Sequence, residues 1–385
     1  MKWEKVKLGD IATFSNGINF NKTAYAKGIK LIGVSNFGDR FYPDYSQLQE
    51  VKKDIVRLED CLRNGDIVFV RSNGNKELVG RCMLVKNPTE RVTYSGFCIR
   101  ARLNDTDRYD PVYFTYYFKS KAFRRAVSGT AVGANIQNLS QARLSNHECR
   151  IPSIEVQHRI ADILSVYDDL IENNQKQIKL LEEAAQRLYK EWFVDLRFPG
   201  HENTEIVDGV PEGWIKEEIG KIIKKVHRTK QIVASEYKDE GSIPIVDQSR
   251  SFVAGYTNDL EARVDFGIPI IVFGDHTRIV KLIQFPFAKG ADGTQLIISD
   301  CLEMPQRLLY CSIMNVDLSN YHYARHFKYL KEEKIMIPTV KVANEFENNV
   351  TGIFSKIQNC RDEIIRCQKI RDLLLPKLMS GEVEV

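Results

Sequence analysis

The sequence predicts an α+β protein in which two α/β globular domains are separated by a long antiparallel two-helix coiled coil with pseudo-twofold symmetry. Two repeated phrases and a repeated helical pattern lead to this prediction. The phrase Trp3-x4-Leu8-Gly9-x-Ile11 returns as Trp214-x4-Ile219-Gly220-x-Ile222, and Ile151-Pro152-Ser153 returns as Ile337-Pro338-Thr339. Because each Ile-Pro phrase opens a long helical pattern, the order along the chain is domain, helix, domain, helix.

The repeats also define the expected boundaries. We expect a first globular domain over residues 1–152, a central helix over 153–195, a linker over 196–213, a second globular domain over 214–338 and a C-terminal helix over 339–385. The offset between the repeats falls from 211 at the Trp phrase to 186 at the Ile-Pro phrase. The second domain is therefore 25 residues shorter between these landmarks (211 − 186).

From Ile160 onward, apolar positions alternate at steps of four and three residues, which is the spacing of a coiled-coil seam. The expected seam is Ile160, Leu164, Tyr167, Ile171, Asn174, Ile178, Leu181, Ala185, Leu188 and Trp192, matched 186 residues later by Phe346, Val350, Ile353, Ile357, Cys360, Ile364, Cys367, Arg371, Leu374 and Leu378. The first seam would span about 50 Å at 1.5 Å per residue. The alternative is two unrelated amphipathic helices, each packed on its own domain.

The ends of the two helices can also be predicted. Ser153 and Thr339 follow a proline and are suited to the N-cap position. Pro376 lies inside the second pattern, so we expect the last turn to kink or end there. Asn174 is a polar residue at a core position, and it either fixes the register of the coiled coil or simply interrupts the seam.

Inside the globular domains, two segments predict a strand–turn–strand unit. They are GDIVFVRSNGNKELVGRCMLV at residues 65–85 and GIPIIVFGDHTRIVKLIQF at residues 267–285. The aromatic-rich segment 111–127 has helical spacing. It predicts a buried helix whose aromatic side chains belong to the core and not to a base-stacking surface.

Composition excludes several classes of protein. The chain has 385 residues, of which 43% are hydrophobic, yet no run approaches a membrane span and the N-terminus shows no secretory signal. We therefore expect a cytoplasmic protein without a membrane segment. The eight cysteines form no CxxC pair and no cluster with histidine, which favours buried free thiols over disulfides or a metal site.

The net charge of +4 is unevenly distributed. Residues 1–152 carry 25 Lys+Arg against 15 Asp+Glu, a net charge of +10, whereas residues 196–338 carry 18 against 20, a net charge of −2. A basic excess is typical of a surface that contacts nucleic-acid phosphates, and two like domains about a twofold axis match the symmetry of duplex DNA. The second domain could bind DNA only through a local basic patch.

Side chains that can form paired hydrogen bonds with base edges are concentrated in a few loops. In the first half the candidate DNA-binding residues are Arg71, Ser72, Asn73, Asn75, Lys76, Arg124, Arg125, Asn135, Gln137 and Asn138. In the second half they are Gln248, Arg250, His276, Thr277, Arg278, Lys289, Thr294, Gln295, Arg325, His326 and Lys328. Of these, Arg124 and Arg125 suit phosphates, which position a protein on DNA without specifying sequence.

No catalytic motif is recognisable. The sequence contains no GxxxxGK[ST], HExxH or GxSxG motif and no glycine-rich cofactor loop, so we assign no catalytic residue, no metal and no cofactor. An Asn/Asp-Pro-Pro-aromatic motif of adenine methyltransferases is also missing. His147-Glu148 and His201-Glu202 are isolated pairs that we interpret as surface polar residues.

Taken together, these features resemble the specificity subunit of type I restriction–modification systems. The likeness rests on the two Trp phrases, the two Ile-Pro helix entries, the run QHRIADILSVYDDLIENNQKQIKLLEEAAQRLYKEWF at residues 157–193 and the ending IRDLLLPKLMSGEV at residues 370–383. It covers the whole chain, although the domain interiors are only loosely alike.

The resemblance implies that each globular half is a target recognition domain that reads one half of a split site in double-stranded DNA. It further implies that the helices set the unread spacer and dock two methylation subunits, with restriction subunits in the full complex. Methylation with S-adenosylmethionine and ATP-driven restriction would then come from those partners. Two alternatives remain at this point: a DNA-modifying enzyme fragment with an unrecognised active site, and a coiled-coil scaffold without DNA readout.

Overall fold

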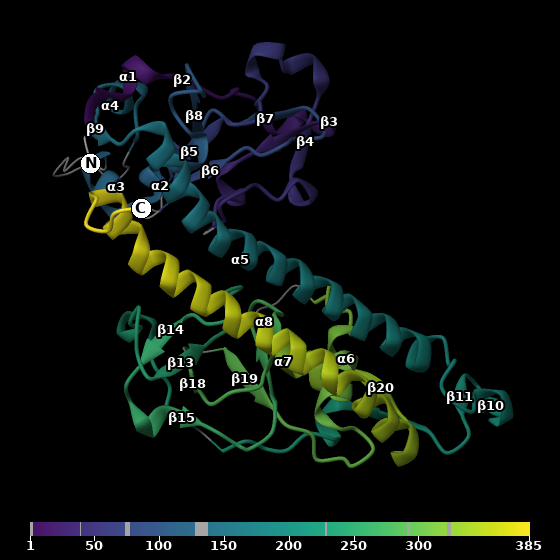
Figure 1. The fold of residues 1–385 in the computed structure, drawn as a ribbon. Helices are drawn as coiled ribbons and strands as arrows, with labels where there is room; N and C mark the ends of the chain where they lie inside the picture. The colour runs from purple at the N-terminus through teal and green to yellow at the C-terminus, as the bar shows by residue number, and fades with distance from the viewer. Residues whose placement is uncertain are drawn as a thin grey trace. The chain divides into compact units, whose positions relative to one another are not determined.

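The structure is a computed structural model that describes residues 3–38, 40–73, 78–127, 138–227, 229–290, 293–321 and 325–385. It divides into two compact units, each of which combines one globular domain with one half of each long helix (Figure 1). Unit 1 comprises residues 1–173 and 363–385, and unit 2 comprises residues 174–362.

Unit 1 is built on three small sheets. Its strands are β1 (Glu4–Lys7), β2 (Ala12–Asn16), β3 (Tyr25–Ile32), β4 (Gln49–Val51), β5 (Ile67–Val70), β6 (Cys82–Leu84), β7 (Val92–Tyr94), β8 (Cys98–Leu103) and β9 (Glu148–Ile151), and its short helices are α1 (Leu8–Ile11), α2 (Pro111–Lys119), α3 (Lys121–Val127) and α4 (Gln141–Ser145). The sheet orders are β2-β8-β5-β6, β4-β3-β7 and β1-β9. Strands β3 and β7 are parallel, whereas the other pairs are antiparallel.

Unit 2 repeats this plan. Its elements are strands β10 (Ile206–Val207), β11 (Val210–Pro211), β12 (Ile215–Glu218), β13 (Ile243–Val246), β14 (Gly255–Thr257), β15 (Arg263–Val264), β16 (Ile270–Gly274), β17 (Val280–Ile283), β18 (Phe287–Lys289), β19 (Thr294–Ile297) and β20 (Lys334–Ile337), with helices α6 (Gln306–Met314) and α7 (His326–Glu332). The order β17-β16-β19 corresponds to β6-β5-β8, and the parallel pair β13–β18 corresponds to β3–β7. Strands β10 and β11 form a separate hairpin in the expected linker.

The strands of both predicted strand–turn–strand units are confirmed, while Gly74 and Asn75 of the first turn lie outside the described residues. In unit 1, β5 and β6 pair antiparallel with Ile67 opposite Leu84, and in unit 2, β16 and β17 pair with Ile270 opposite Ile283. Strands β5 and β16 are buried along their whole length. This burial explains their uninterrupted apolar runs, because a strand covered on both faces has no polar side.

The predicted helix over residues 111–127 is divided in two. Helix α2 ends at Lys119 and α3 begins at Lys121, because Ser120 takes an extended conformation and its hydroxyl accepts a hydrogen bond from the backbone N–H of Phe123 at 3.2 Å. Such local side-chain bonds compete with a continuous helix. The aromatic side chains do form part of the core as predicted, since Tyr113, Phe114 and Phe118 are fully buried.

The two repeated sequence phrases pair with each other in space. Glu4, which follows Trp3, lies opposite Ile151, and Ile215, which follows Trp214, lies opposite Ile337. In each unit the start of the globular domain is thereby hydrogen-bonded to the strand that leads into a long helix.

The glycine of each Trp phrase lies where the backbone is packed closely. A Cβ atom on Gly9 would lie 3.0 Å from the Ser145 carbonyl oxygen, and one on Gly220 would lie 3.0 Å from the Lys331 carbonyl oxygen. The absence of a side chain at these two positions therefore permits α1 to approach α4, and the corresponding segment of unit 2 to approach α7.

The long helices α5 (Ile154–Tyr189) and α8 (Val340–Ser380) pack against each other in opposite directions within each unit (Figure 1). In unit 1, Ile160 and Leu164 of α5 share a core cluster with Leu378 near the end of α8. In unit 2, Trp192, just after α5, shares one with Phe346 near the start of α8. The antiparallel pairing predicted from the seam is confirmed, and the alternative of two unrelated helices is wrong.

The seam residues are buried to different degrees. Ile160, Leu164, Ile171, Asn174, Ala185, Trp192, Phe346, Val350, Ile357, Cys360, Cys367 and Leu378 are buried, whereas Tyr167, Ile178, Leu181, Leu188, Ile353, Ile364, Arg371 and Leu374 are half-buried. Asn174 is 2% exposed, so this polar side chain does occupy a core position. Helix α5 begins directly after Ser153 and α8 directly after Thr339, as the N-cap prediction requires.

Of the two outcomes expected at Pro376, an end of the helix is not found, since α8 continues to Ser380, and a kink there stays a prediction. Proline removes one helical hydrogen bond. The following turn is nevertheless fixed because Leu378 is 1% exposed in the core of unit 1. The helix ends where Gly381 adopts a left-handed conformation with φ +74°.

No helix in the described part of the chain combines the length and apolar character that a membrane span requires. All eight cysteines are free thiols, and all except Cys301 are buried. Burial raises the pKa of Cys82 to about 11 and that of Cys98 to about 12, so these thiols stay protonated near neutral pH.

A buried ion pair joins α5, α8 and the globular part of unit 1. Asp168 accepts a hydrogen bond from the Arg371 guanidinium at 2.6 Å through one carboxylate oxygen and from the Tyr116 hydroxyl at 2.6 Å through the other. The side chains of Asp168 and Arg371 are only 4% and 13% exposed. Arg371, a charged residue at a seam position, therefore has a partner that satisfies its charge inside the protein.

We predict that Arg371→Ala lowers the free energy of unfolding by roughly 3 kcal/mol, because it leaves the Asp168 carboxylate buried without its counter-charge. Urea denaturation of the full chain measures this loss. Arg366→Ala, at an exposed position of the same helix, is the matched control and should change stability little. Equal effects of the two substitutions would contradict a structural role for the buried pair.

Candidate nucleic-acid interface

In unit 1, two of the loops predicted to bind DNA lie side by side. Ser72 forms an isolated antiparallel bridge with Asn138, and the backbone N–H of Leu139 donates to the carbonyl oxygen of Arg71 at 2.9 Å. The segment that follows β5 is thus held against the segment that precedes α4. Asn138 is exposed, and Arg71 and Ser72 are half-buried.

An aromatic side chain that the sequence analysis did not select lies beside these loops. The backbone N–H of Arg71 donates to the carbonyl oxygen of Phe97 at 2.8 Å, and its guanidinium donates to that of Gly96 at 3.4 Å. Phe97 is 62% exposed. The available signal was a Ser-Gly-Phe turn between two apolar runs, which is too common to single out a residue.

The remaining candidates of the first half fall into three groups. Asn75, Lys76, Asn135 and Gln137 lie outside the described residues. Asn73, next to Ser72, is half-buried. Arg124 is half-buried and Arg125 is exposed, and both belong to α3, a separate element from the loop of Arg71. They keep the role of phosphate contacts as a prediction.

Unit 2 brings together the corresponding segments. The residue after β16 is Asp275, whose carbonyl oxygen accepts from the backbone N–H of His326 at 2.9 Å. Its carboxylate accepts from the backbone N–H of Phe327 at 2.8 Å. In both units the loop after the central strand therefore meets the chain close to the start of a short helix: Arg71 meets Leu139, just before α4, and Asp275 meets His326, the first residue of α7.

A second group of predicted residues surrounds Gln248. The Gln248 amide oxygen accepts from the backbone N–H of His276 at 3.1 Å, and its carbonyl oxygen accepts from the Thr277 hydroxyl at 2.7 Å. Arg278 is exposed, but its guanidinium donates to the carbonyl oxygen of Leu318 at 2.8 Å. Gln248, His276 and Thr277, which were selected from two separate segments of the sequence, thus lie in one loop cluster.

Two predicted residues are not available to a duplex. His326 is 5% exposed and Thr294 is fully buried, so the expectation that they bind DNA is not supported by their positions. Burial lowers the pKa of His326, which keeps its ring neutral near pH 7. In contrast, Arg250, Arg325 and Lys328 are exposed, and Lys328 lies 4.0 Å from Glu332 on the same helix.

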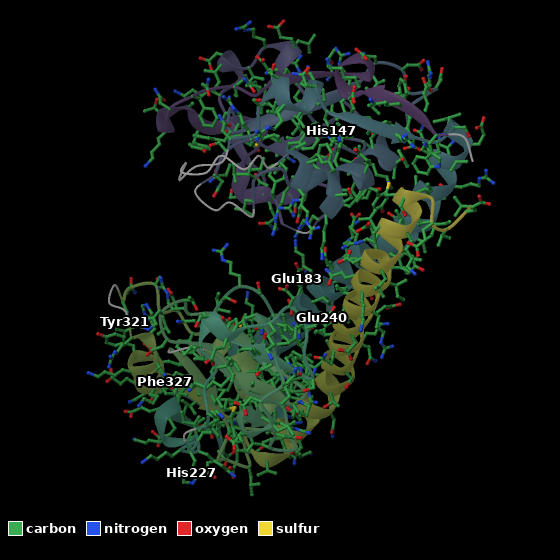
Figure 2. The ribbon with its side chains drawn as sticks, turned by 90° about the vertical axis from the view of Figure 1, so that its left-hand side faces the viewer. His147, Glu183, His227, Glu240, Tyr321 and Phe327 are labelled. Atoms are coloured by element: carbon green, nitrogen blue, oxygen red, sulfur yellow. The ribbon has the colours of Figure 1, made fainter. Side chains whose placement is uncertain are left out.

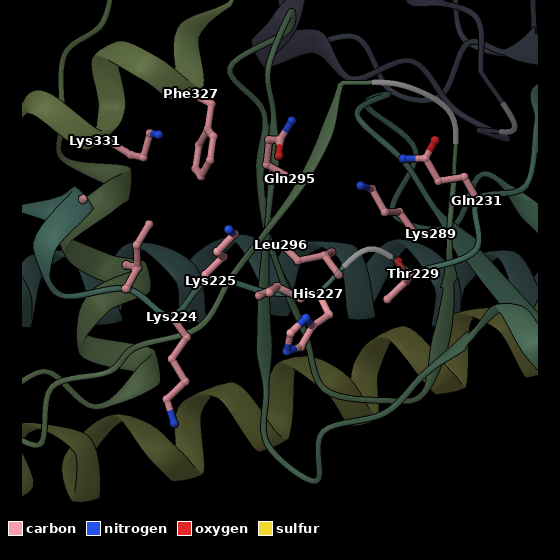
Figure 3. A pocket seen from close by; sticks show the side chains of 13 residues that line it. Lys224, Lys225, His227, Thr229, Gln231, Lys289, Gln295, Leu296, Phe327 and Lys331 are labelled. Atoms are coloured by element: carbon pink, nitrogen blue, oxygen red, sulfur yellow. The ribbon is translucent and has the colours of Figure 1, made fainter.

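Unit 2 also contains a basic cleft of about 850 Å³, shown in Figure 3. Its lining consists of Gly220, Ile223, Lys224, Lys225, Val226, His227, Thr229, Gln231, Lys289, Gln295, Leu296, Phe327 and Lys331. Figure 2 labels His227 and Phe327, two of the lining residues, within unit 2. The segment after β12, strands β18 and β19, and helix α7 together contribute these residues.

The cleft is the local basic patch that the overall charge of this half does not reveal. Four lysines line it, and none of the described lining residues is acidic. Lys224 lies 3.5 Å from Asp300 at the surface, and Lys331 lies 5.3 Å from the centre of the Phe327 ring. Only Lys289 and Gln295 were selected from the sequence. A sequence signal for the cleft was nevertheless present, because Lys224, Lys225 and His227 form a short basic run.

Comparison with known proteins identifies the chain's family. The family model described as the type I restriction modification DNA specificity domain matches residues 1–183. The specificity subunit of the type I restriction enzyme MjaIX from Methanocaldococcus jannaschii is 30% identical over 335 residues, which cover 80% of this chain and 76% of that protein. The chain belongs to the specificity subunits of type I restriction–modification systems. It is accordingly a DNA-recognition protein that acts with other subunits of such a system.

Two further relatives of this specificity subunit match different shares of the chain. The HindI specificity subunit of Haemophilus influenzae is 28% identical over 204 residues, covering 50% of this chain and 41% of that protein. The crystal structure of the S subunit from M. genitalium aligns with this chain with a TM-score of 0.56 at 18% identity. The alignment covers 98% of this chain and 96% of the M. genitalium chain. That structural likeness supports the fold.

The described residues contain no group of three or more His, Cys, Asp or Glu side chains arranged to hold a metal ion. Exposed amide and guanidinium groups can pair with base edges, and the lysines of the cleft can neutralise phosphates.

We predict that replacing Lys225 and Lys289 together by alanine weakens DNA binding across all sequences, because lysine contacts with phosphate carry no sequence information. The slope of log K against log salt should become shallower by about 0.9 for each phosphate that the protein no longer neutralises. Titration of the assembled complex with a labelled duplex at several salt concentrations measures both effects.

Lys216→Ala on β12 is the matched control, since Lys216 is exposed in the same unit but does not line the cleft. A double variant that keeps the salt slope of the unmodified protein would show that the cleft does not contact phosphate.

Proposed function

We propose that this specificity subunit reads a bipartite site in double-stranded DNA, with each globular unit reading one half. The observation that carries the proposal is the repeated construction of the two units. In each, a loop after the central strand is hydrogen-bonded to the chain at or just before the start of a short helix, at Arg71–Leu139 and at Asp275–His326. Polar side chains gather at both places, which supports two separate readers of base edges.

The two readers differ in how they would hold the phosphate backbone. In unit 1 a net charge of +10 over residues 1–152 supplies a broadly basic domain. In unit 2 the lysines of the cleft supply a local patch within a domain whose overall charge is slightly negative. Because charge neutralisation dominates affinity for DNA, both arrangements support phosphate contact.

We further propose that the paired helices set the length of the unread spacer and dock the methylation subunits. Apolar side chains that face solvent along the helices support docking, and they include Val166 and Leu170 on α5 and Leu373 on α8. In this proposal the specificity subunit is not itself catalytic. Methylation of adenine with S-adenosylmethionine comes from the methylation subunits, and ATP-dependent cleavage comes from the restriction subunits.

Mapping of methylated bases tests this function directly. We predict that a host carrying the subunit and its methylation partner methylates a motif of two short specific segments separated by a spacer of fixed length. Single-molecule sequencing of the genomic DNA shows the motif, and a host without the subunit is the control. A continuous motif, or methylation that does not depend on the subunit, would contradict the proposal.

The role of the helices gives a second test, in which both helices are lengthened together because they are paired. Seven residues inserted after Asn174 in α5 and seven after Cys360 in α8 preserve the heptad spacing and add about 10 Å of helix. We predict that the two specific segments of the motif stay unchanged while the spacer grows by roughly three base pairs, at 3.4 Å each. The control inserts seven residues into one helix only, which should disrupt the seam and abolish methylation. An unchanged spacer would refute the role of the helices as a ruler.

A further inference from the structure

Phe97 is an exposed aromatic residue next to the loops that are proposed to read DNA in unit 1. It lies in the turn between β7 and β8 and is 62% exposed. Tyr94 and Cys98, which lie on either side of the turn, are buried. Leaving a phenylalanine ring in water forgoes the stabilisation that burial of the ring would give. An exposed ring on a surface that binds a partner can gain this stabilisation when the partner covers it.

The backbone of the turn that carries Phe97 is held by hydrogen bonds and close packing. Its N–H donates to the Ser95 hydroxyl at 3.3 Å, and the N–H of Gly96 donates to the carbonyl oxygen of Ile18 at 2.7 Å. A Cβ atom on Gly96 would lie 2.0 Å from the amide oxygen of Asn19, so the turn packs closely on the neighbouring loop. Because its backbone is already ordered, Phe97 would lose little further backbone entropy when it meets a ligand.

The backbone of Phe97 is also hydrogen-bonded to a segment that carries groups suited to base edges. The Phe97 carbonyl oxygen accepts from the backbone N–H groups of Arg71 at 2.8 Å and Ser72 at 3.4 Å, and Ser72 is bridged to Asn138. Arginine and asparagine form their paired hydrogen bonds with guanine and adenine in the major groove. If Arg71 and Asn138 enter the major groove, the Phe97 side chain would enter it as well, because its backbone is hydrogen-bonded to that of Arg71. The apolar group that the bases present in this groove is the C5-methyl group of thymine.

We propose that Phe97 contacts the C5-methyl group of a thymine in the half-site read by unit 1. The inference rests on the proposed function and deepens it, because it assigns one apolar contact to a reader otherwise composed of hydrogen-bonding groups. Phe97 is thereby a specificity-determining residue that discriminates an A·T pair by shape and not by charge.

Uracil replaces thymine without changing base pairing and removes only the methyl group, so it isolates this contact. The full chain, assembled with its methylation subunits, is titrated with duplexes that carry the mapped site and a uracil in place of each thymine in turn. We expect one uracil to weaken binding by the unmodified complex about fourfold, the factor for burial of one such carbon group. Phe97→Ala should bind the thymine duplex roughly tenfold more weakly and should not distinguish thymine from uracil at that position.

Two further variants separate this role from a structural one. Phe97→Leu keeps an apolar side chain and should retain part of the preference for thymine. Leu58→Ala is the matched control, since Leu58 is 68% exposed in the same unit, and it should keep the full preference. Because the ring is exposed and the turn is held by backbone bonds, Phe97→Ala should fold, and it should leave the salt dependence of binding unchanged.

A complex that tolerates uracil at every position, or a Phe97→Ala variant that keeps the full preference for thymine, would overturn the proposal. A rise in the fluorescence of 2-aminopurine next to the site that depends on Phe97 would also overturn it, since it would show a ring wedged between bases. Failure of the complex to bind any split motif would instead contradict the proposed function, so the two failures are distinguishable.

Discussion

The antiparallel pairing of two short strands, where each globular domain joins its long helix, is the constraint on which the structure depends. In unit 1 this pair is β1 and β9, and in unit 2 it is β12 and β20. The pairing fixes the beginning of a domain beside the entry of the helix that follows it. A shift of one residue would turn every side chain of the strand to its opposite face, so the register is strongly specified. The interior of each domain can consequently change in length without altering its attachment.

The paired helices are then fixed to each unit by different charged side chains. In unit 1 the buried pair of Asp168 and Arg371 includes a tyrosine of the globular part. In unit 2, Arg361 of α8 donates to Glu182 of α5 at 2.8 Å and lies 3.7 Å from the centre of the Phe252 ring. The apolar seam alone can tolerate alternative registers. A buried charge with one correct partner disfavours the others, because any shift would leave it unpaired.

The two units that are proposed to read DNA have the same framework but expose different chemistry. The first combines amide and guanidinium groups with one exposed aromatic ring on a basic domain. The second has a lysine-lined cleft within a domain of slightly negative charge, and its corresponding loop begins with Asp275, whose carboxylate is occupied by a backbone N–H. In the proposed function, two units of unlike chemistry suit a DNA site whose halves differ in sequence. The common framework accounts for the repeat, and the loops account for its divergence.

The sequence by itself determined the order of the elements, the antiparallel seam and the family, because hydrophobic periodicity and the repeated phrases are local patterns. It also located the loops around Arg71 and Gln248 as polar clusters. Only the tertiary structure decided which polar residues are accessible, burying His326 and Thr294 and gathering Lys225, Lys289 and Lys331 around one cleft. Those outcomes depend on contacts between segments that are distant along the chain. Burial and proximity are properties of such contacts, and no local pattern encodes them.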